Sequence, residues 1–245
     1  MEERIKQLKA LIDKSERIVF FGGAGTSTES GVKDYRSEDG LYNTVKEYGV
    51  SPEVILSHTF LFEKPEVFYD FYYKYFLAED VFPNKAHKAL ARLEEMGKLS
   101  CVITQNIDGL HQAAGSKNVL ELHGTTYEHY CSVCRQPYER EKLKALCGGV
   151  PKCEKCGALV RPKVVLYEES LYEKTVMAAV NALSDADLLI IGGTSLAVYP
   201  AASYIGYYGG KDIVLINRGE TRYDHMATLV FREKIGEVLD EVVNE

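Results

Sequence analysis

Short runs of apolar residues recur along the chain and alternate with segments whose apolar residues have helical spacing. The apolar runs predict strands at 18–21, 101–104, 119–122, 188–191, 212–216 and 229–231. The helical spacing predicts helices at 3–14, 86–96, 172–183 and 201–208. Strands that alternate with helices indicate an α/β fold with a parallel sheet that is covered on both faces.

Two stretches interrupt this alternation. Residues 35–85 are rich in aromatic side chains with a mostly helical pattern, and residues 126–165 contain four paired cysteines. We expect them to form an inserted small domain, a helical module plus a four-cysteine zinc module. The nucleotide-binding domain would then consist of residues 1–34, 86–125 and 166–245. We interpret the aromatic residues at 68–76 as core of the helical module, with a ligand site as the alternative.

The charge of the chain narrows its possible partners. The 245 residues carry a formal net charge of −7, which argues against nucleic acid, because phosphate binding relies on an excess of Lys and Arg. No apolar run approaches the ~20 residues that cross a bilayer, and the N-terminal segment lacks the apolar region of a secretory signal. We therefore expect a soluble, cytoplasmic protein with no membrane partner.

Four cysteines form two Cys-x-x-Cys pairs, Cys131 with Cys134 and Cys153 with Cys156. Paired thiolates at this spacing are typical of tetrahedral Zn²⁺ sites, and four thiolates leave no open position for catalysis. Disulfides are the alternative, which a reducing cytoplasm disfavours. Cys147 lies between the pairs as a possible substitute ligand, and we interpret Cys101, in an apolar run, as a core residue.

Glycine-rich and polar segments follow the predicted strands. In open parallel sheets, ligands bind outside the carboxyl ends of the strands. The first strand runs into Gly23, Ala24 and Gly25, which predicts backbone N–H groups at a helix N-terminus, ready for a pyrophosphate; a tight turn is the alternative. The chain lacks the acidic residue that a dehydrogenase needs about 20 residues later, which counts against hydride transfer. Asn217, after the fifth strand, could bind a ribose hydroxyl instead.

Three further side chains at or near strand ends suggest chemistry. His123 precedes a glycine and suits a general base near neutral pH; a hydrogen-bonded histidine or a zinc ligand are the alternatives. Asp108, next to Gln105 and Asn106, could bind an amide or a ribose, or form an Asx turn. Arg36 could pair with phosphate or with a nearby carboxylate such as Asp34.

These motifs, taken in order over nearly the whole chain, resemble those of the sirtuins, the NAD-dependent protein deacylases. The resemblance implies a Rossmann-like domain joined to a zinc-bearing small domain, with NAD and an acetyl-lysine protein or peptide meeting between them. It implies His123 as the catalytic base, and Val164, Val165 and Leu166 as the segment that pairs with the substrate backbone. The implied NAD-binding residues are Gly23, Ala24, Gly25, Thr28, Asp34, Tyr35, Arg36, Gln105, Asn106, Ile107, Asp108, Gly193, Thr194, Ser195, Asn217 and Ile235.

The implied activity is protein-lysine deacetylation that consumes NAD and gives nicotinamide and O-acetyl-ADP-ribose. Mono-ADP-ribosyl transfer, removal of longer neutral acyl groups and a non-catalytic NAD- or zinc-dependent binding module are the alternatives. Sirtuins that prefer acidic acyl groups carry a Tyr-x-x-Arg pair, and no arginine occurs here between Arg36 and Arg92. We therefore expect a neutral acyl group. Tyr35 and Glu168 depart from the family's usual phenylalanine and glycine.

Overall fold

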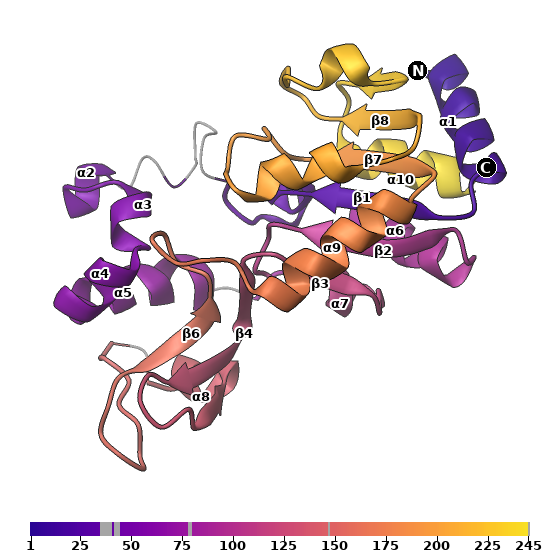
Figure 1. The fold of residues 1–245 in the computed structure, drawn as a ribbon. Helices are drawn as coiled ribbons and strands as arrows, with labels where there is room; N and C mark the ends of the chain where they lie inside the picture. Colours follow the sequence, from indigo (N-terminus) through magenta and orange to yellow (C-terminus); the bar gives the residue numbers. More distant parts are fainter. Residues whose placement is uncertain (35–40, 42–44, 78–79, 147, 245) are drawn as a thin grey trace.

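The computed structural model describes residues 1–34, 41, 45–77, 80–146 and 148–244. Its larger unit is a six-stranded parallel sheet with the order β3-β2-β1-β7-β8-β9 (Figure 1). The strands are β1 (Ile18–Gly22), β2 (Leu99–Thr104), β3 (Val119–Glu121), β7 (Leu188–Gly192), β8 (Asp212–Ile216) and β9 (Leu229–Phe231). All six strands expected from the apolar runs are confirmed.

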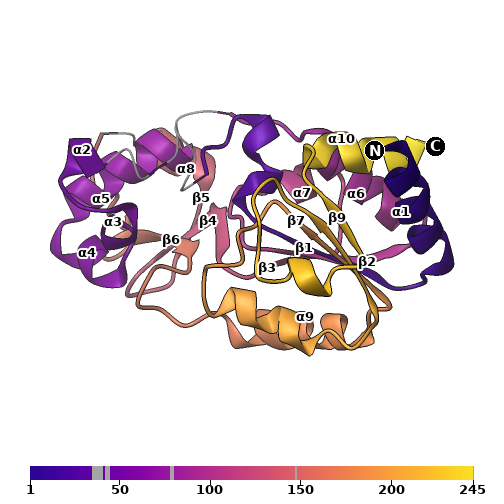
Figure 2. The same cartoon turned by 90° about the horizontal axis from the view of Figure 1, so that it is seen from above.

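Helices cover both faces of this sheet, as the edge-on view of Figure 2 shows. One face carries α1 (Glu2–Lys14), α6 (Lys85–Glu95) and α10 (Ile235–Asn244); the other carries α9 (Glu173–Asp185) and the 3₁₀ helix η5 (Ala201–Tyr207). Successive residues of β1 point to opposite faces. Ile18 and Phe20 therefore join the core under α1, α6 and α10, whereas Val19 and Phe21 join the core under α9.

Two helical expectations need correction. The helix expected at 201–208 is a 3₁₀ helix, and the glycine turn after β1 leads into two short 3₁₀ turns, η1 (Ala24–Thr26) and η2 (Thr28–Ser30), instead of an α-helix. Threonine and serine favour local side-chain hydrogen bonds over helix continuation. The turn then ends at Gly31, whose φ of +86° is left-handed.

The smaller unit contains an antiparallel sheet with the order β5-β4-β6, formed by β4 (Gly124–Cys131), β5 (Pro137–Glu139) and β6 (Val160–Val164). The same unit contains α2 (Val45–Tyr48), α3 (Pro52–Ile55), α4 (His58–Glu63), α5 (Pro65–Tyr72), the π-helical turn η4 (Tyr73–Leu77) and α8 (Arg140–Lys144). The core of this unit joins Phe68, Tyr69 and Tyr72 to Cys131 and Val160. The two inserted stretches thus share one core; their precise domain boundaries stay a prediction.

The remaining short elements are α7 (Leu110–Ala113), which follows β2, and the 3₁₀ turn η6 (Asp224–Met226), which precedes β9. In the part of the chain that the structure describes, no helix has the length and apolar character that a membrane crossing requires.

Candidate active site

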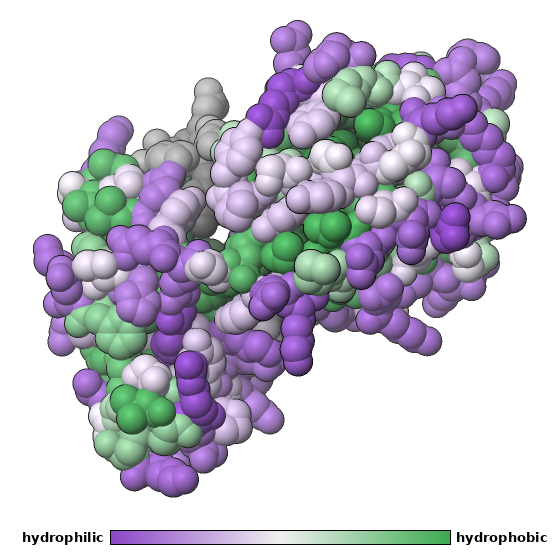
Figure 3. Space-filling view, viewed as in Figure 1, coloured by the Kyte–Doolittle hydropathy of each residue, from purple (hydrophilic) through white to green (hydrophobic). Residues whose placement is uncertain are grey.

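A cavity of about 990 Å³ opens at the carboxyl ends of β1, β2, β7 and β8 and extends along the smaller unit. The space-filling view is hollowed where the two units meet (Figure 3). The following predicted site residues line the cavity: Gly23, Ala24, Gly25, Thr28, Asp34, Gln105, Asn106, Ile107, Asp108, His123, Val164, Val165, Leu166, Gly193, Thr194, Ser195, Asn217 and Ile235. Tyr35 and Arg36 lie outside the described residues.

The glycine turn packs against the loop that follows β7. The Gly25 N–H donates to the Gly193 carbonyl at 2.8 Å, and the Gly23 N–H donates to the Gly192 carbonyl at 3.3 Å. A Cβ atom on Gly25 would lie 2.8 Å from the Gly193 backbone, so only glycine permits this approach. The expectation that these N–H groups are free is therefore wrong for Gly23 and Gly25.

His123 directly precedes β4 and is half-buried in the cavity wall. Its Nδ1 atom lies 2.8 Å from the backbone carbonyl oxygen of Gln105. A carbonyl can only accept, so Nδ1 carries the hydrogen and Nε2 is the basic nitrogen of the neutral ring. Burial lowers the pKa of His123, although the hydrogen bond to Gln105 acts in the opposite direction. The imidazole is consequently neutral at physiological pH, the form that a general base requires.

Asp108 belongs to a hydrogen-bonded chain with two other side chains. The Asn106 amide donates to the Ser27 hydroxyl at 3.0 Å, and that hydroxyl donates to the Asp108 carboxylate at 2.7 Å. The other carboxylate oxygen accepts from the Leu110 N–H at 3.0 Å, which is the Asx turn considered as the alternative. Burial raises the pKa of Asp108, opposed by these hydrogen bonds. The turn thus holds a polar group rigidly at the cavity wall.

Sequence reasoning missed two buried histidines behind this chain. The Nε2 atom of His87 lies 3.4 Å from the Ser27 hydroxyl, and the ring of His111 packs edge-on against His87 with centroids 4.7 Å apart. Burial lowers the pKa of His87 to about 4 and that of His111 to about 3. Both stand singly within apolar helical patterns, and no sequence spacing connects either one to Ser27.

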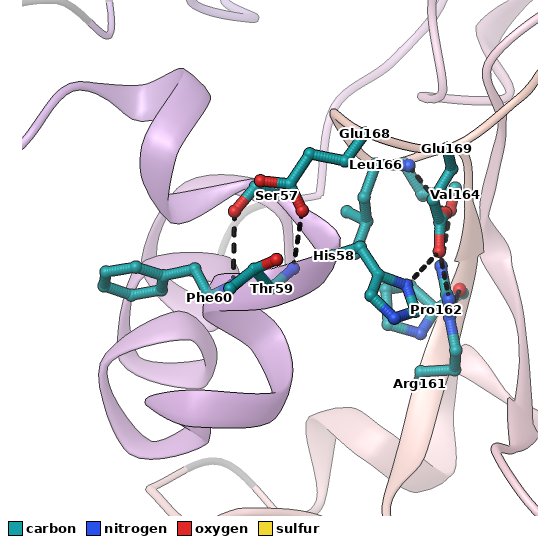
Figure 4. Close-up of polar contacts among 10 residues, drawn as sticks. All are labelled: Ser57, His58, Thr59, Phe60, Arg161, Pro162, Val164, Leu166, Glu168 and Glu169. Carbon is teal, nitrogen blue, oxygen red and sulfur yellow. Dashed lines mark hydrogen bonds and ion pairs between the residues drawn. The ribbon is translucent and has the colours of Figure 1, made fainter.

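The predicted substrate segment lines the cavity, but its N–H groups are partly in use. The Val165 N–H donates to the His123 carbonyl, and the Leu166 N–H donates to the Glu169 carboxylate, both at 2.9 Å. Figure 4 shows that carboxylate between the Arg161 guanidinium and the His58 ring. These two N–H groups are therefore not available to an added strand.

The four predicted zinc ligands converge. Their sulfur atoms all lie within 4.8 Å of one another, with 3.4 Å between Cys131 and Cys156 and 3.6 Å between Cys134 and Cys153. These distances exclude disulfides among the four and approach the ~3.8 Å edge of a tetrahedron with Zn–S bonds of about 2.3 Å. The cluster fits a zinc-binding module. Cys101 is buried in the sheet core as expected, and Cys147 lies outside the described residues.

Comparisons with known proteins agree with this geometry. A model of the Sir2 family matches residues 23–200. Proteins named NAD-dependent protein deacetylase are 52% identical over 245 residues in Clostridium perfringens, covering all of both chains, and 50% identical over 241 residues in Clostridium acetobutylicum, covering 98% of each.

Solved structures of similar proteins extend the likeness to three dimensions. One, described as "Structural Basis for the Mechanism and Regulation of Sir2 Enzymes", has a TM-score of 0.90 and 36% identity, and the match covers 100% of this chain and 98% of that one. Another, described as "Sir2-p53 peptide-NAD+", has a TM-score of 0.86 and 38% identity, covering 98% of this chain and 97% of that one. This chain belongs to the Sir2 family.

Proposed function

We propose that this chain is an NAD-dependent protein-lysine deacetylase that yields free lysine, nicotinamide and O-acetyl-ADP-ribose. The observation that carries the proposal is the neutral imidazole of His123 in the wall of a cavity that reaches both units. His123 acts as the base that takes a proton from a ribose hydroxyl, and its Nε2 atom receives that proton. The names of the related proteins support the same activity.

NAD occupies the part of the cavity at the sheet edge. Its pyrophosphate lies at the Gly23–Gly25 turn, where the Ala24 N–H has no acceptor among the described residues. Gln105, Ile107 and Asp108 contact the nicotinamide half, and Thr194, Ser195 and Asn217 contact the adenosine half. Lysine and arginine side chains on this part of the wall supply charge that attracts phosphate; they are Lys33, Arg218 and Lys234. Tyr35 and Arg36 complete the proposed NAD site.

The substrate peptide pairs as an added strand with the segment that follows β6. Within the described part of the chain, the Val165 carbonyl and the N–H groups of Glu168 and Ser170 have no hydrogen-bond partner. These groups lie next to Val164 and Leu166, whose side chains line the cavity. A peptide strand that used them would bring its acetyl-lysine to the cavity mouth beside His123.

Longer neutral acyl groups are a second candidate, which the aromatic stretch favours. Phe68 and Tyr72 belong to the core of the smaller unit, as expected, but they also line the cavity together with Tyr75 and Phe76. Phe68 and Tyr72 are fully buried, but Tyr75 and Phe76 are only half-buried, and a hydrocarbon chain that covered their exposed apolar surface would be stabilised by its removal from water. Comparison of kcat/KM on acetyl-, butyryl- and myristoyl-lysine peptides tests this candidate.

We propose structural zinc on Cys131, Cys134, Cys153 and Cys156, where it holds the two knuckles of the smaller unit together. The ion would leave no open position for chemistry, so its contribution is to folding. Retention of four thiolates requires a reducing compartment, which supports a cytoplasmic location.

Mass spectrometry of an acetyl-lysine peptide, incubated with and without NAD, tests the main proposal. We expect the peptide to lose its acetyl group and nicotinamide to be released only when NAD is present. Neither reaction should turn over in His123→Ala. His225→Ala is the matched control, because His225 is exposed. Release of nicotinamide while the peptide stays unchanged would favour ADP-ribosyl transfer or NAD hydrolysis. No turnover of any acyl peptide would favour a binding module.

A further inference from the structure

Glu168 stands in an unusual backbone conformation at the rim of the cavity. Its φ of +77° is in the left-handed region, which glycine adopts readily and a glutamate adopts at a cost. The position lies two residues beyond Leu166, and the side chain is exposed and lines the cavity. A side chain kept at such a position, where glycine would fit without strain, points to a role for that side chain.

The Glu168 carboxylate is held in one place. It accepts a hydrogen bond from the Thr59 N–H at 2.9 Å, at the start of α4, as Figure 4 shows. That backbone hydrogen bond and a second one from the Thr59 side chain lower the pKa of Glu168, so the group is ionised at neutral pH. The backbone around it is also fixed, because the Tyr167 N–H and carbonyl pair with Leu56 and His58. Glu168 is therefore a fixed negative charge.

The part of the cavity wall around Glu168 carries acidic side chains. The cavity wall contributed by residues 53–56 and 164–171 contains Glu53, Glu168 and Glu169, and no Lys or Arg from these ranges lines it. Glu169 is neutralised by Arg161, with which it makes two hydrogen bonds. The lysines and arginines that line the cavity come from other segments, such as Arg218 and Lys234 at the NAD end. The cavity wall formed by these two ranges is therefore acidic, although carboxylates such as Glu29 and Glu233 line other parts of the cavity as well.

We infer that Glu168 selects acetylated peptides that carry a lysine or arginine close to the acetyl-lysine. The inference rests on the proposed deacetylase function and names its substrate class. The Val165 N–H donates a hydrogen bond to the His123 carbonyl, so these two residues are neighbours. Glu168 lies three residues beyond Val165, and three residues of extended chain span at most about 10 Å. A basic side chain one or two residues from the acetyl-lysine spans that distance.

The test measures kcat and KM on four peptides that share one acetyl-lysine core and differ only in flanking positions: lysine, norleucine, alanine or glutamate. For the unchanged protein we expect a kcat/KM at least 5-fold higher with lysine than with norleucine. The difference should lie mainly in KM and shrink at 0.5 M salt, because exposed charges are screened. E168Q keeps an oxygen acceptor for the Thr59 N–H and should bring the lysine and norleucine peptides to within about 2-fold.

Two further variants make the result specific. E63Q removes an exposed carboxylate from the same small unit and should keep the full lysine preference. E168G removes the carboxylate and relieves the left-handed strain, so it should also lose the lysine preference. A lysine preference that survives in E168Q, or the lack of any preference in the unchanged protein, overturns the inference. Failure of the unchanged protein to deacetylate even the norleucine and alanine peptides would instead contradict the proposed function.

Discussion

The ring of His123 and the backbone of Gln105 form a fixed pair, with 2.8 Å between Nδ1 and the carbonyl oxygen. Gln105 is itself tied to neighbouring strands, through its N–H to the Gly22 carbonyl at 3.0 Å and through its side chain to Thr194 at 3.1 Å. The ends of β1, β2 and β7 thus jointly determine which ring nitrogen is basic. The tautomer follows from the parallel sheet rather than from a neighbouring acid.

The pH dependence of deacetylation should reflect this environment. Burial lowers the pKa of His123 below 6.5, so the ring stays neutral and able to accept a proton as the pH falls through 6.5. We expect kcat/KM to be flat from pH 8 to 6.5 and to decline only below that range, and His123→Ala to lower it about 10²- to 10⁴-fold. Steady-state rates on one acetyl peptide, with circular dichroism at each pH to verify folding, check this; an acid limb centred above pH 6.5 would contradict it.

Gly193 should be intolerant of any side chain. Its φ is +58°, and an added Cβ would lie 2.2 Å from the Thr26 nitrogen and 2.5 Å from the Gly25 carbonyl carbon. Gly193→Ala must therefore displace the glycine turn, and we expect NAD affinity to fall at least 10-fold by calorimetric titration. Gly206→Ala is the control, because nothing lies within 4 Å of its added Cβ. Equal NAD affinity in the two variants would show that the turn does not hold NAD.

The buried histidine His111 should make the fold sensitive to acid. Burial lowers its pKa to about 3, whereas the unfolded chain binds the proton near 6.5. The contribution of neutral His111 to the free energy of unfolding is fully present above pH 6.5. Below pH 6.5 it falls by about 1.4 kcal/mol per pH unit, because only the unfolded state takes up the proton. Among the described residues neither ring nitrogen of His111 has a hydrogen-bond partner, so His111→Leu should remove the share of the slope that His111 contributes, without a large loss of stability at pH 7. Urea unfolding at pH 4.5–7 measures it.

The control for this prediction is His225→Leu, which removes an exposed histidine and should leave the slope of unfolding free energy against pH unchanged. A slope in His111→Leu equal to that of the unchanged protein would assign the acid sensitivity to other groups. Burial also lowers the pKa of His87 and of His129 to about 4, so part of the slope should remain.

The zinc prediction concerns stability rather than turnover. The Cys153 sulfur also accepts a hydrogen bond from the Tyr138 hydroxyl at 3.3 Å, so its surroundings suit a thiolate. We expect one zinc per chain by metal analysis, and loss of zinc with a lower Tm in Cys153→Ala, because metal binding contributes directly to the folding of such modules. Cys101→Ala, in the sheet core, should keep one zinc per chain. A metal-free chain with an unchanged Tm would exclude a structural ion.

The sequence predicts the fold well because the sheet is regular. Parallel strands buried on both faces give continuous apolar runs, and polar residues directly after each run, such as Gln105 and Asn217, must lie at the same edge of the sheet. Spacing alone also finds Cys131 and Cys153, since each belongs to a local pair. These features depend on neighbours in the chain, which a single sequence displays.

What the sequence does not predict depends on contacts between distant segments. The Gly25 N–H is occupied because the turn packs on Gly193, 168 positions away, so a motif that looks like an open anion site has less room than its residues suggest. His87 reaches Ser27 only after α6 docks on the sheet. The sequence marks Glu168 only as a departure from the family's usual glycine, and its left-handed φ and its hydrogen bond to Thr59 become known only from the structure.

Glu169 should stabilise the predicted substrate segment, residues 164–166, through its ion pair with Arg161. Burial opposes ionisation of Glu169, but hydrogen bonds from Arg161 and His58 lower its pKa to about 2. Glu169→Gln would leave the Arg161 guanidinium, on a residue only 6% exposed, without its carboxylate. Loss of one partner of a buried pair costs about 3–5 kcal/mol, and we expect about 2–3 because the Glu169 side chain is one-fifth exposed.

The measurement for Glu169→Gln is urea unfolding together with the KM for peptide and for NAD. Because the carboxylate also holds the Leu166 N–H, the KM for peptide should rise several-fold while the KM for NAD changes little. E168Q is the matched comparison: it removes the neighbouring charge without breaking a buried pair, so it should keep the stability of the unchanged protein. An equal rise in the KM for peptide and the KM for NAD would show that the substitution disturbs the whole cavity and not only the predicted substrate segment.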